Sequence, residues 1–168
     1  MARNKQVLVI GDSADYPERN AIAYTMGRFI AANGWVLVSG GRGGVMQAAS
    51  RGASEGGGIA LAILPSDSMD EANPFAAIII PTGIGFARNY INVLAADVVV
   101  AIGGGTGTLC EIAYAWQAGK PIIACSMSGG WAEELAGRTL DYRRDDAIIS
   151  AATIEEAQEQ LAAILKTE

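Results

Sequence analysis

Seven short runs rich in valine, isoleucine and leucine, separated by stretches with helical periodicity, constrain the fold of this chain more than any other feature. Strands that alternate with helices form a parallel sheet with both faces covered. The sequence therefore predicts an α/β fold, a Rossmann-like three-layer sandwich with a mostly parallel sheet of about seven strands. The expected strands are 7–10, 35–38, 59–64, 77–80, 97–102, 121–125 and 147–150, and the expected helices are 17–33, 45–55, 86–96, 108–118 and 154–166.

Two segments, 65–76 and 126–146, lack clear periodicity, and we expect surface loops with room for a helical turn. The chain shows no internal repeat and no linker. Its 168 residues suit one domain, and 51% hydrophobic against 18% charged residues suits strands buried on both faces. We therefore expect residues 1–168 to form a single Rossmann-like domain that binds a nucleotide or phosphate.

Composition excludes several classes of function. The net charge of -6 and the scattered basic residues argue against nucleic acid as a partner. The first apolar run is too short for a signal peptide or a membrane span, so we expect a cytoplasmic protein with no membrane partner. There is no histidine, and the two cysteines lie in apolar settings, so neither a metal site nor a disulfide is expected.

Glycines gather just after the expected strands. Residues 40–44, 83–85 and 103–107 hold nearly half of the 21 glycines. These positions are the carboxyl ends of strands, the edge at which open parallel sheets bind ligands. The sequence thus places a ligand site at this edge.

The run from Gly103 to Thr108 joins a strand to a helix with four glycines and two threonines. Glycines allow positive φ and close approach, and the free amides of a helix N-terminus attract an anion, so the run predicts a phosphate site. A tight turn that needs its glycines only for geometry is the alternative. No lysine follows as in a Walker A loop, and the G-x-G-x-x-G pattern of NAD sites is absent.

Glu111 lies three residues after Thr108 and has two open interpretations. The spacing is that of a capping box, in which the threonine hydroxyl bonds the Glu111 amide and the carboxylate reaches back. Alternatively, the carboxylate lies beside the phosphate site and orients a sugar hydroxyl or a water.

Other residues at the same edge extend the predicted site. Arg42 and Arg88 are candidate phosphate-binding cations. The alternative for Arg42 is a solvated loop charge, and the alternative for Arg88 is a helix-surface arginine in a salt bridge. Arg88, Asn89 and Asn92 make the expected helix after the third glycine cluster unusually polar. Gly11, Asp12 and Ser13 follow the first strand at the same edge. The predicted ligand-binding residues are Gly11, Ser13, Gly40, Gly41, Arg42, Gly43, Arg88, Asn89, Gly103, Gly104, Gly105, Thr106, Gly107, Thr108 and Glu111.

Four elements in order, GGRGGVM, GGGIALAILP, an arginine-bearing helix and DVVVAIGGGTGTLCE, resemble the LOG superfamily of Rossmann-like nucleotide-binding proteins over residues 6–125. The overall form is similar to the branch that includes the molybdenum cofactor carrier proteins. In LOG phosphoribohydrolases, the resemblance implies catalytic roles for the residues that fall on Arg88 and Glu111. Two departures are clear: Ile102 replaces the proline before the glycine turn, and 86–89 lack the family's histidine and lysine.

The leading hypothesis is a binding or carrier protein for a phosphorylated ligand, a nucleotide or the molybdenum cofactor, with no cofactor required. The alternative is a nucleoside 5'-monophosphate phosphoribohydrolase that uses Arg88 and Glu111. A third option is a structural oligomer-forming subunit without a ligand. The label lysine decarboxylase, given to some such proteins, finds no support in the three lysines. The resemblance also implies a homo-oligomer, a dimer or a tetramer.

Overall fold

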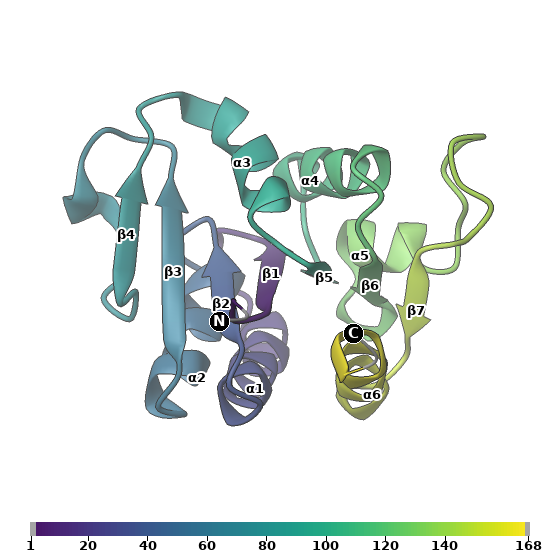
Figure 1. Cartoon of the computed structure of the whole chain (residues 1–168), viewed down its shortest axis with the longest axis horizontal. Coiled ribbons are helices and arrows are strands. Elements are labelled where there is room, and N and C mark those ends of the chain that lie inside the picture. The colour runs from purple at the N-terminus through teal and green to yellow at the C-terminus, as the bar shows by residue number, and fades with distance from the viewer. Residues whose placement is uncertain (1–2, 167–168) are drawn as a thin grey trace.

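The computed structural model describes residues 3–166, which form a seven-stranded sheet with helices on both faces (Figure 1). All six neighbouring strand pairs are parallel, which confirms the predicted Rossmann-like α/β class. The strands are β1 Gln6–Gly11, β2 Val36–Ser39, β3 Ile59–Leu64, β4 Ile78–Pro81, β5 Val98–Ile102, β6 Ile122–Cys125 and β7 Ile149–Ala151. The helices are α1 Pro17–Ala32, α2 Val45–Glu55, α3 Arg88–Leu94, α4 Thr106–Gln117, α5 Gly130–Leu135 and α6 Ile154–Lys166.

The strand order is β4-β3-β2-β1-β5-β6-β7, so the direction of winding reverses between β1 and β5. The register pairs Val7 with Val98 and Gly11 with Ile102, and the two strands therefore end side by side. The glycine turn 103–105 starts at that point. The crevice where winding reverses is the usual ligand position in such sheets.

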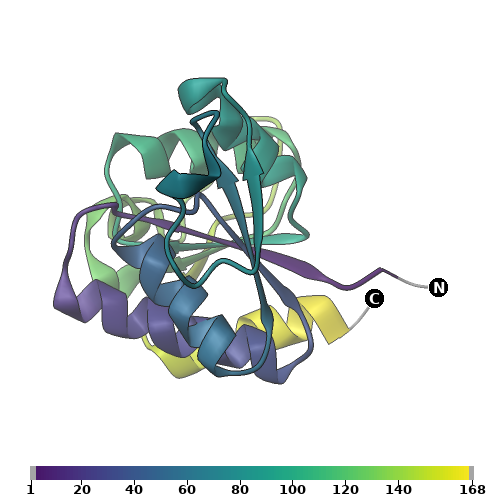
Figure 2. The same ribbon diagram turned by 90° about the vertical axis from the view of Figure 1, so that its left-hand side faces the viewer.

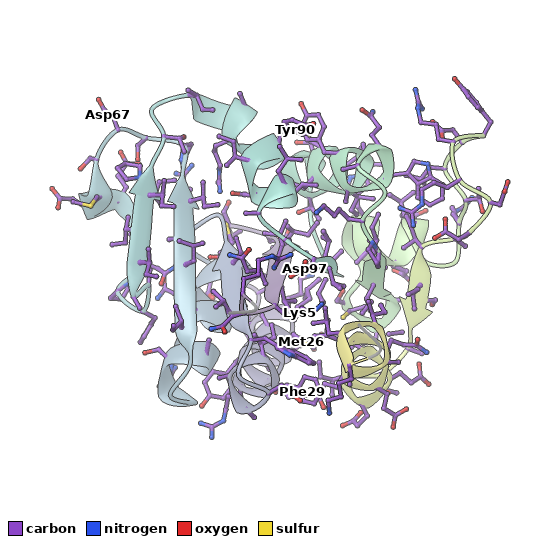
Figure 3. The ribbon with its side chains drawn as sticks, viewed as in Figure 1. Lys5, Met26, Phe29, Asp67, Tyr90 and Asp97 are labelled. Atoms are coloured by element: carbon purple, nitrogen blue, oxygen red, sulfur yellow. The ribbon has the colours of Figure 1, made fainter. Side chains whose placement is uncertain are left out.

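Helices α1, α2 and α6 cover one face of the sheet, and α3, α4 and α5 cover the other (Figures 1 and 2). Figure 3 shows Met26 and Phe29 on the α1 side and Tyr90 on α3. The inner strand β5 is buried along its whole length, because its valines face a helical layer on each side. The edge strand β4, in contrast, alternates between exposed and half-buried residues.

Helices α1 and α2 approach so closely that their backbones touch at two glycines. A Cβ at Gly27 would overlap the carbonyl oxygen of Ala49, and a Cβ at Gly52 would overlap that of Tyr24. Glycine in a helix interior normally destabilises it by about 1 kcal/mol relative to alanine. Here the close packing of the two helices offsets this cost, because only glycine lets their backbones come so near to each other.

The element boundaries differ from expectation in three places. Helix α5 occupies part of the expected loop 126–146, since six residues are too few to show a helical period. Helix α4 begins at Thr106, not near Thr108. The helix expected over 86–96 is α-helical only over α3, and a 3-10 turn, Gly85–Ala87, precedes it.

Within residues 3–166, no helix combines the length and the apolar character needed to cross a lipid bilayer.

Replacing Gly27 with alanine should destabilise the protein by about 2 kcal/mol, because the added methyl group overpacks a backbone contact. Urea unfolding measures the change. The matched control is Gly107→Ala in α4, where the added Cβ meets open space and the free energy of unfolding should stay constant or rise by up to about 1 kcal/mol. Equal effects of the two substitutions would contradict the close crossing.

Candidate functional site

A cavity of about 290 Å³ opens at the carboxyl edge of the sheet where winding reverses; we call it the switch-point cavity. Its floor is the end of β1, and its walls come from the turn after β2, the start of α3 and the first turns of α4. Eleven of the fifteen predicted ligand-binding residues line it. They are Gly11, Ser13, Gly40, Arg42, Arg88, Asn89, Gly105, Thr106, Gly107, Thr108 and Glu111.

The glycine turn divides into two halves with different uses. The Gly103 amide donates to Ser128 Oγ at 2.7 Å, and the Gly104 amide donates to Asp12 Oδ2 at 2.8 Å. These two residues do not line the cavity, and their amides already have partners within the protein. Gly104 must be glycine, since its φ is +103° and a Cβ would overlap Thr108.

The second half of the turn forms the N-terminus of α4. Gly105 is the N-cap residue, and no side chain from residues 3–166 caps the helix. Gly105, Thr106 and Gly107 are exposed and line the cavity. The first amides of a helix have no partner within the helix, and they carry the positive end of its dipole. This end of α4 therefore offers the cavity uncommitted hydrogen-bond donors.

Arg88 is buried at the start of α3 and is only 6% exposed. Its Nη1 donates to the carbonyl oxygen of Ile63 at 2.7 Å, while Nε has no partner among the described residues. The guanidinium lies against Gly40, where any Cβ would overlap it. Burial lowers the pKa of Arg88, whereas the charge of Glu111 raises it. The surface salt bridge considered for Arg88 is therefore wrong, because the side chain points into the molecule.

Glu111 does not belong to a capping box, because α4 begins at Thr106 and Thr108 already lies within its first turn. The Glu111 carboxylate accepts a hydrogen bond from Asn92 Nδ2 at 2.8 Å. Burial raises the pKa of Glu111 to about 7, although the Asn92 hydrogen bond and the Arg88 charge oppose the shift. Near neutral pH the group is therefore partly protonated.

Four predicted residues lie outside the cavity, two in each of two turns. Gly103 and Gly104 are described above. Gly41 has φ +74°, its amide donates to Ser39 Oγ and its carbonyl oxygen accepts from the Asn73 amide, so it shapes the turn after β2. Gly43 lines a separate groove between α1 and α2. Arg42, between these two glycines, is exposed and lines the cavity.

A network around Asp12 supports the cavity. Asp12 Oδ2 accepts from Arg19 Nη1 at 2.7 Å and from the Gly104 amide, and Arg19 Nε donates to the Ser128 carbonyl oxygen at 2.9 Å. The sequence places Asp12 at this edge of the sheet but predicts no role for Arg19 or Ser128. No short-range pattern signals the network, because Arg19 and Ser128 are 109 residues apart.

Asn92 is a further residue of the site that the sequence does not predict, although the sequence shows that its helix is unusually polar. It is fully buried, holds Glu111, and has an Oδ1 atom with no partner among the described residues. The signal that points to it is its spacing four residues after Arg88, since residues at i and i+4 share one helix face.

The chain is similar to several known proteins. A protein of Archaeoglobus fulgidus is 46% identical over 119 residues, which cover 71% of this chain and 78% of that protein. The molybdenum cofactor binding protein from Rippkaea orientalis is 35% identical with a TM-score of 0.85, and the match covers 98% of this chain and 99% of that protein. The molybdenum cofactor carrier protein from Chlamydomonas reinhardtii is 31% identical with a TM-score of 0.81 and the same coverage.

These likenesses confirm the resemblance to the Rossmann-like branch that includes the molybdenum cofactor carrier proteins. A family model matches residues 4–158, nearly the whole of the chain. The chain belongs to the SLOG cluster4 family.

Proposed function

We propose that this chain is a binding or carrier protein that holds the phosphate of a small ligand, the molybdenum cofactor or a nucleotide, in the switch-point cavity. The observation that carries the proposal is the uncapped N-terminus of α4, which faces a cavity lined by Arg42 and Arg88. Backbone amides at a helix start and arginine guanidinium groups both bind phosphate well. The molybdenum cofactor proteins of similar structure support a ligand-binding role.

The charge of the cavity favours an anion. Two arginines line it, and its carboxylates are committed: Asp12 pairs with Arg19, and Glu111 is partly protonated near neutral pH. The buried Nε of Arg88 lacks a partner among residues 3–166, and an unpaired buried donor costs about 1–3 kcal/mol. An oxyanion that enters the cavity supplies an acceptor for it.

A phosphoribohydrolase is the second candidate, because Arg88 and Glu111 lie in one cavity. A carboxylic acid with a pKa near 7 is suited to proton transfer at neutral pH. This function requires release of free base from a nucleoside monophosphate. A binding protein leaves the same compound intact, so chromatography of AMP after incubation separates the two candidates.

We also propose a homo-oligomer built on the exposed apolar side chains of α3 and the turn before it. Phe86 is 81% exposed and Leu94 is 51% exposed, and the exposed side chains of Ile84 and Tyr90 belong to the same stretch of the chain. The edge strand β4 adds Ile78 and Ile80. Exposed large apolar side chains in such numbers favour a protein interface.

Arg42→Ala should weaken the binding of AMP and of inorganic phosphate about tenfold, because a charge-assisted hydrogen bond contributes about 1.5–3 kcal/mol. Isothermal titration calorimetry measures both. Arg28→Ala, which removes an exposed arginine on α1 outside the cavity, is the control and should change affinity less than twofold. Equal affinities for wild type and Arg42→Ala would contradict the proposed anion site.

Glu111→Gln should change how stability depends on pH. In the wild type the folded-state pKa of about 7 lies above the ordinary 4.5, so the folded state holds a proton that the unfolded state releases. This contribution is fully present below pH 4.5 and is lost by pH 7, a total of about 3 kcal/mol. Urea unfolding at pH 5 and pH 8 should show Glu111→Gln gaining most of that amount relative to wild type at the higher pH. A constant difference would exclude the raised pKa.

The same variant separates the two functions. If the protein only binds its ligand, Glu111→Gln and wild type both leave AMP intact and bind it with similar affinity. Release of adenine by wild type, abolished in Glu111→Gln, would instead establish the hydrolase.

Leu94→Arg should convert the oligomer to a smaller species, since it places a charge within the apolar surface of α3. Sedimentation velocity measures the mass. Tyr142→Arg is the control, because Tyr142 is 90% exposed in the loop after α5. A monomeric wild type, or an unchanged mass in Leu94→Arg, would overturn the proposed interface.

A further inference from the structure

Glu111 is a buried acid in the wall of the switch-point cavity. Its side chain is only 8% exposed, and its carboxylate accepts a hydrogen bond from Asn92 Nδ2 at 2.8 Å. Within residues 3–166 no ion pair reaches this carboxylate, although Arg88 lines the same cavity. A carboxylate with so few partners is costly to ionise away from water. The charge of Glu111 therefore depends on what else occupies the cavity.

Three further charged side chains line the cavity, each from a different element. Arg88 belongs to α3, Arg42 to the turn after β2 and Asp12 to the end of β1. Asp12 is already paired with Arg19 at 2.7 Å. When Glu111 is ionised, its charge offsets one of the two arginines of the cavity. When Glu111 is protonated, both positive charges are available to an anion.

The other titratable side chains near Glu111 lie outside the cavity. Cys110 and Tyr114 of α4 interact with each other, and the Tyr114 ring lies 5.2 Å from that of Tyr90 on α3. The contact with Cys110 raises the pKa of Tyr114, so the phenol stays neutral between pH 6 and pH 9. None of the three side chains lines the cavity. Glu111 is thus the carboxyl group of the cavity wall that has no cation partner of its own.

Asn92 can serve Glu111 in both protonation states. Its Nδ2 donates to the carboxylate, and its Oδ1 is buried without a partner among the described residues. Rotation of the terminal amide by half a turn exchanges the two atoms, since this torsion is broad. Oδ1 then accepts a hydrogen bond from the protonated carboxyl group. A change in the charge of Glu111 therefore leaves no new unpaired group between the two side chains.

We propose that the switch-point cavity takes up one proton together with its oxyanion. The proton comes from water and forms the O–H bond of the Glu111 carboxyl group, and it returns to water when the anion leaves. The anion itself gains no proton and loses no bond. This inference rests on the proposed function, because it requires that an oxyanion binds in this cavity.

The electrostatics of the cavity give the direction of the coupling. The cavity encloses only about 290 Å³, so an anion at the start of α4 lies close to Glu111 in the following turn of the same helix. Two negative charges so close repel each other, and the anion favours protonation of Glu111. The coupling is reciprocal, so protonation of Glu111 strengthens anion binding by the same factor.

The affinity should therefore fall as the pH rises. Burial raises the pKa of Glu111 in the empty cavity to about 7, so the fall begins near this pH. The phosphate of AMP becomes more negative over the same range, because a phosphate monoester loses its second proton near about pH 6. Two arginines alone would therefore bind AMP more tightly at high pH. Proton uptake by Glu111 predicts the opposite trend.

Isothermal titration calorimetry with AMP at pH 6.5 and pH 8.5 tests the proposal. We expect binding about tenfold weaker at pH 8.5, equivalent to a change of about one pKa unit in Glu111 on binding. Titrations at pH 8 in buffers with different heats of ionisation count the protons, and we expect uptake of about half a proton or more per AMP. An affinity that is constant or rises with pH, without proton uptake, would overturn the proposal.

Three variants identify the group that takes up the proton. Glu111→Gln should lose both the fall in affinity and the proton uptake. Glu134→Gln, which changes an exposed carboxylate outside the cavity, should keep both. Asn92→Leu removes a hydrogen bond that favours ionised Glu111, so it should move the fall in affinity to higher pH.

The outcomes separate this inference from the proposed function. Proton uptake that persists in Glu111→Gln would overturn the inference, as would an unmoved pH profile in Asn92→Leu. AMP binding that does not depend on pH leaves the proposed function intact and refutes only the coupling. If neither AMP nor inorganic phosphate binds at either pH, both fail together.

Discussion

Asp12, the first residue after β1, connects four separate parts of the chain. Its carboxylate accepts hydrogen bonds from Arg19 of α1 and from the amide of Gly104 after β5, and its carbonyl oxygen accepts from the amide of Val45 at the start of α2. The parallel register of β1 and β5 brings these groups within reach, since Gly11 and Ile102 are paired. Without this carboxylate the Gly104 amide and the Arg19 guanidinium would lose a shared partner at the centre of the site. The geometry of the switch-point cavity therefore depends on one side chain.

The switch-point cavity combines charges that would be unstable if each were isolated. Arg88 is almost completely buried, yet it donates a hydrogen bond to the Ile63 carbonyl oxygen, and the charge of Glu111 stabilises its charged form. Glu111 is held by Asn92, and burial keeps part of its population protonated at neutral pH. The sheet edge thus holds fixed donors with few available acceptors, an arrangement suited to an anionic guest. The buried carboxyl group of Glu111 is also the feature that favours a hydrolase as the second candidate function.

The sequence predicts the frame of this protein well because its strands are short valine-rich runs and its turns are marked by glycine. The expected strand 59–64 coincides with β3, and the expected helix 45–55 coincides with α2. The site was harder to predict. The capping-box interpretation of Glu111 failed because the start of α4 is set by the extended backbone of Gly105, which local spacing does not reveal. Arg19 and Ser128 were missed because tertiary structure alone joins them, and α5 was missed because it is too short to show a period.

The glycine crossing of α1 and α2 ties the two ends of these helices to each other. The two backbones touch at Gly27 and Gly52, so neither helix can slide or rotate without the other. The pair therefore moves as one rigid unit. Helix α1 carries Arg19, which holds Asp12, and α2 starts just after Arg42, so two parts of the cavity wall are attached to this pair of helices. A shift at the crossing would move Arg19 and Arg42 together. Substitutions at these two buried glycines would then change the ligand binding of the protein, although neither glycine touches the ligand.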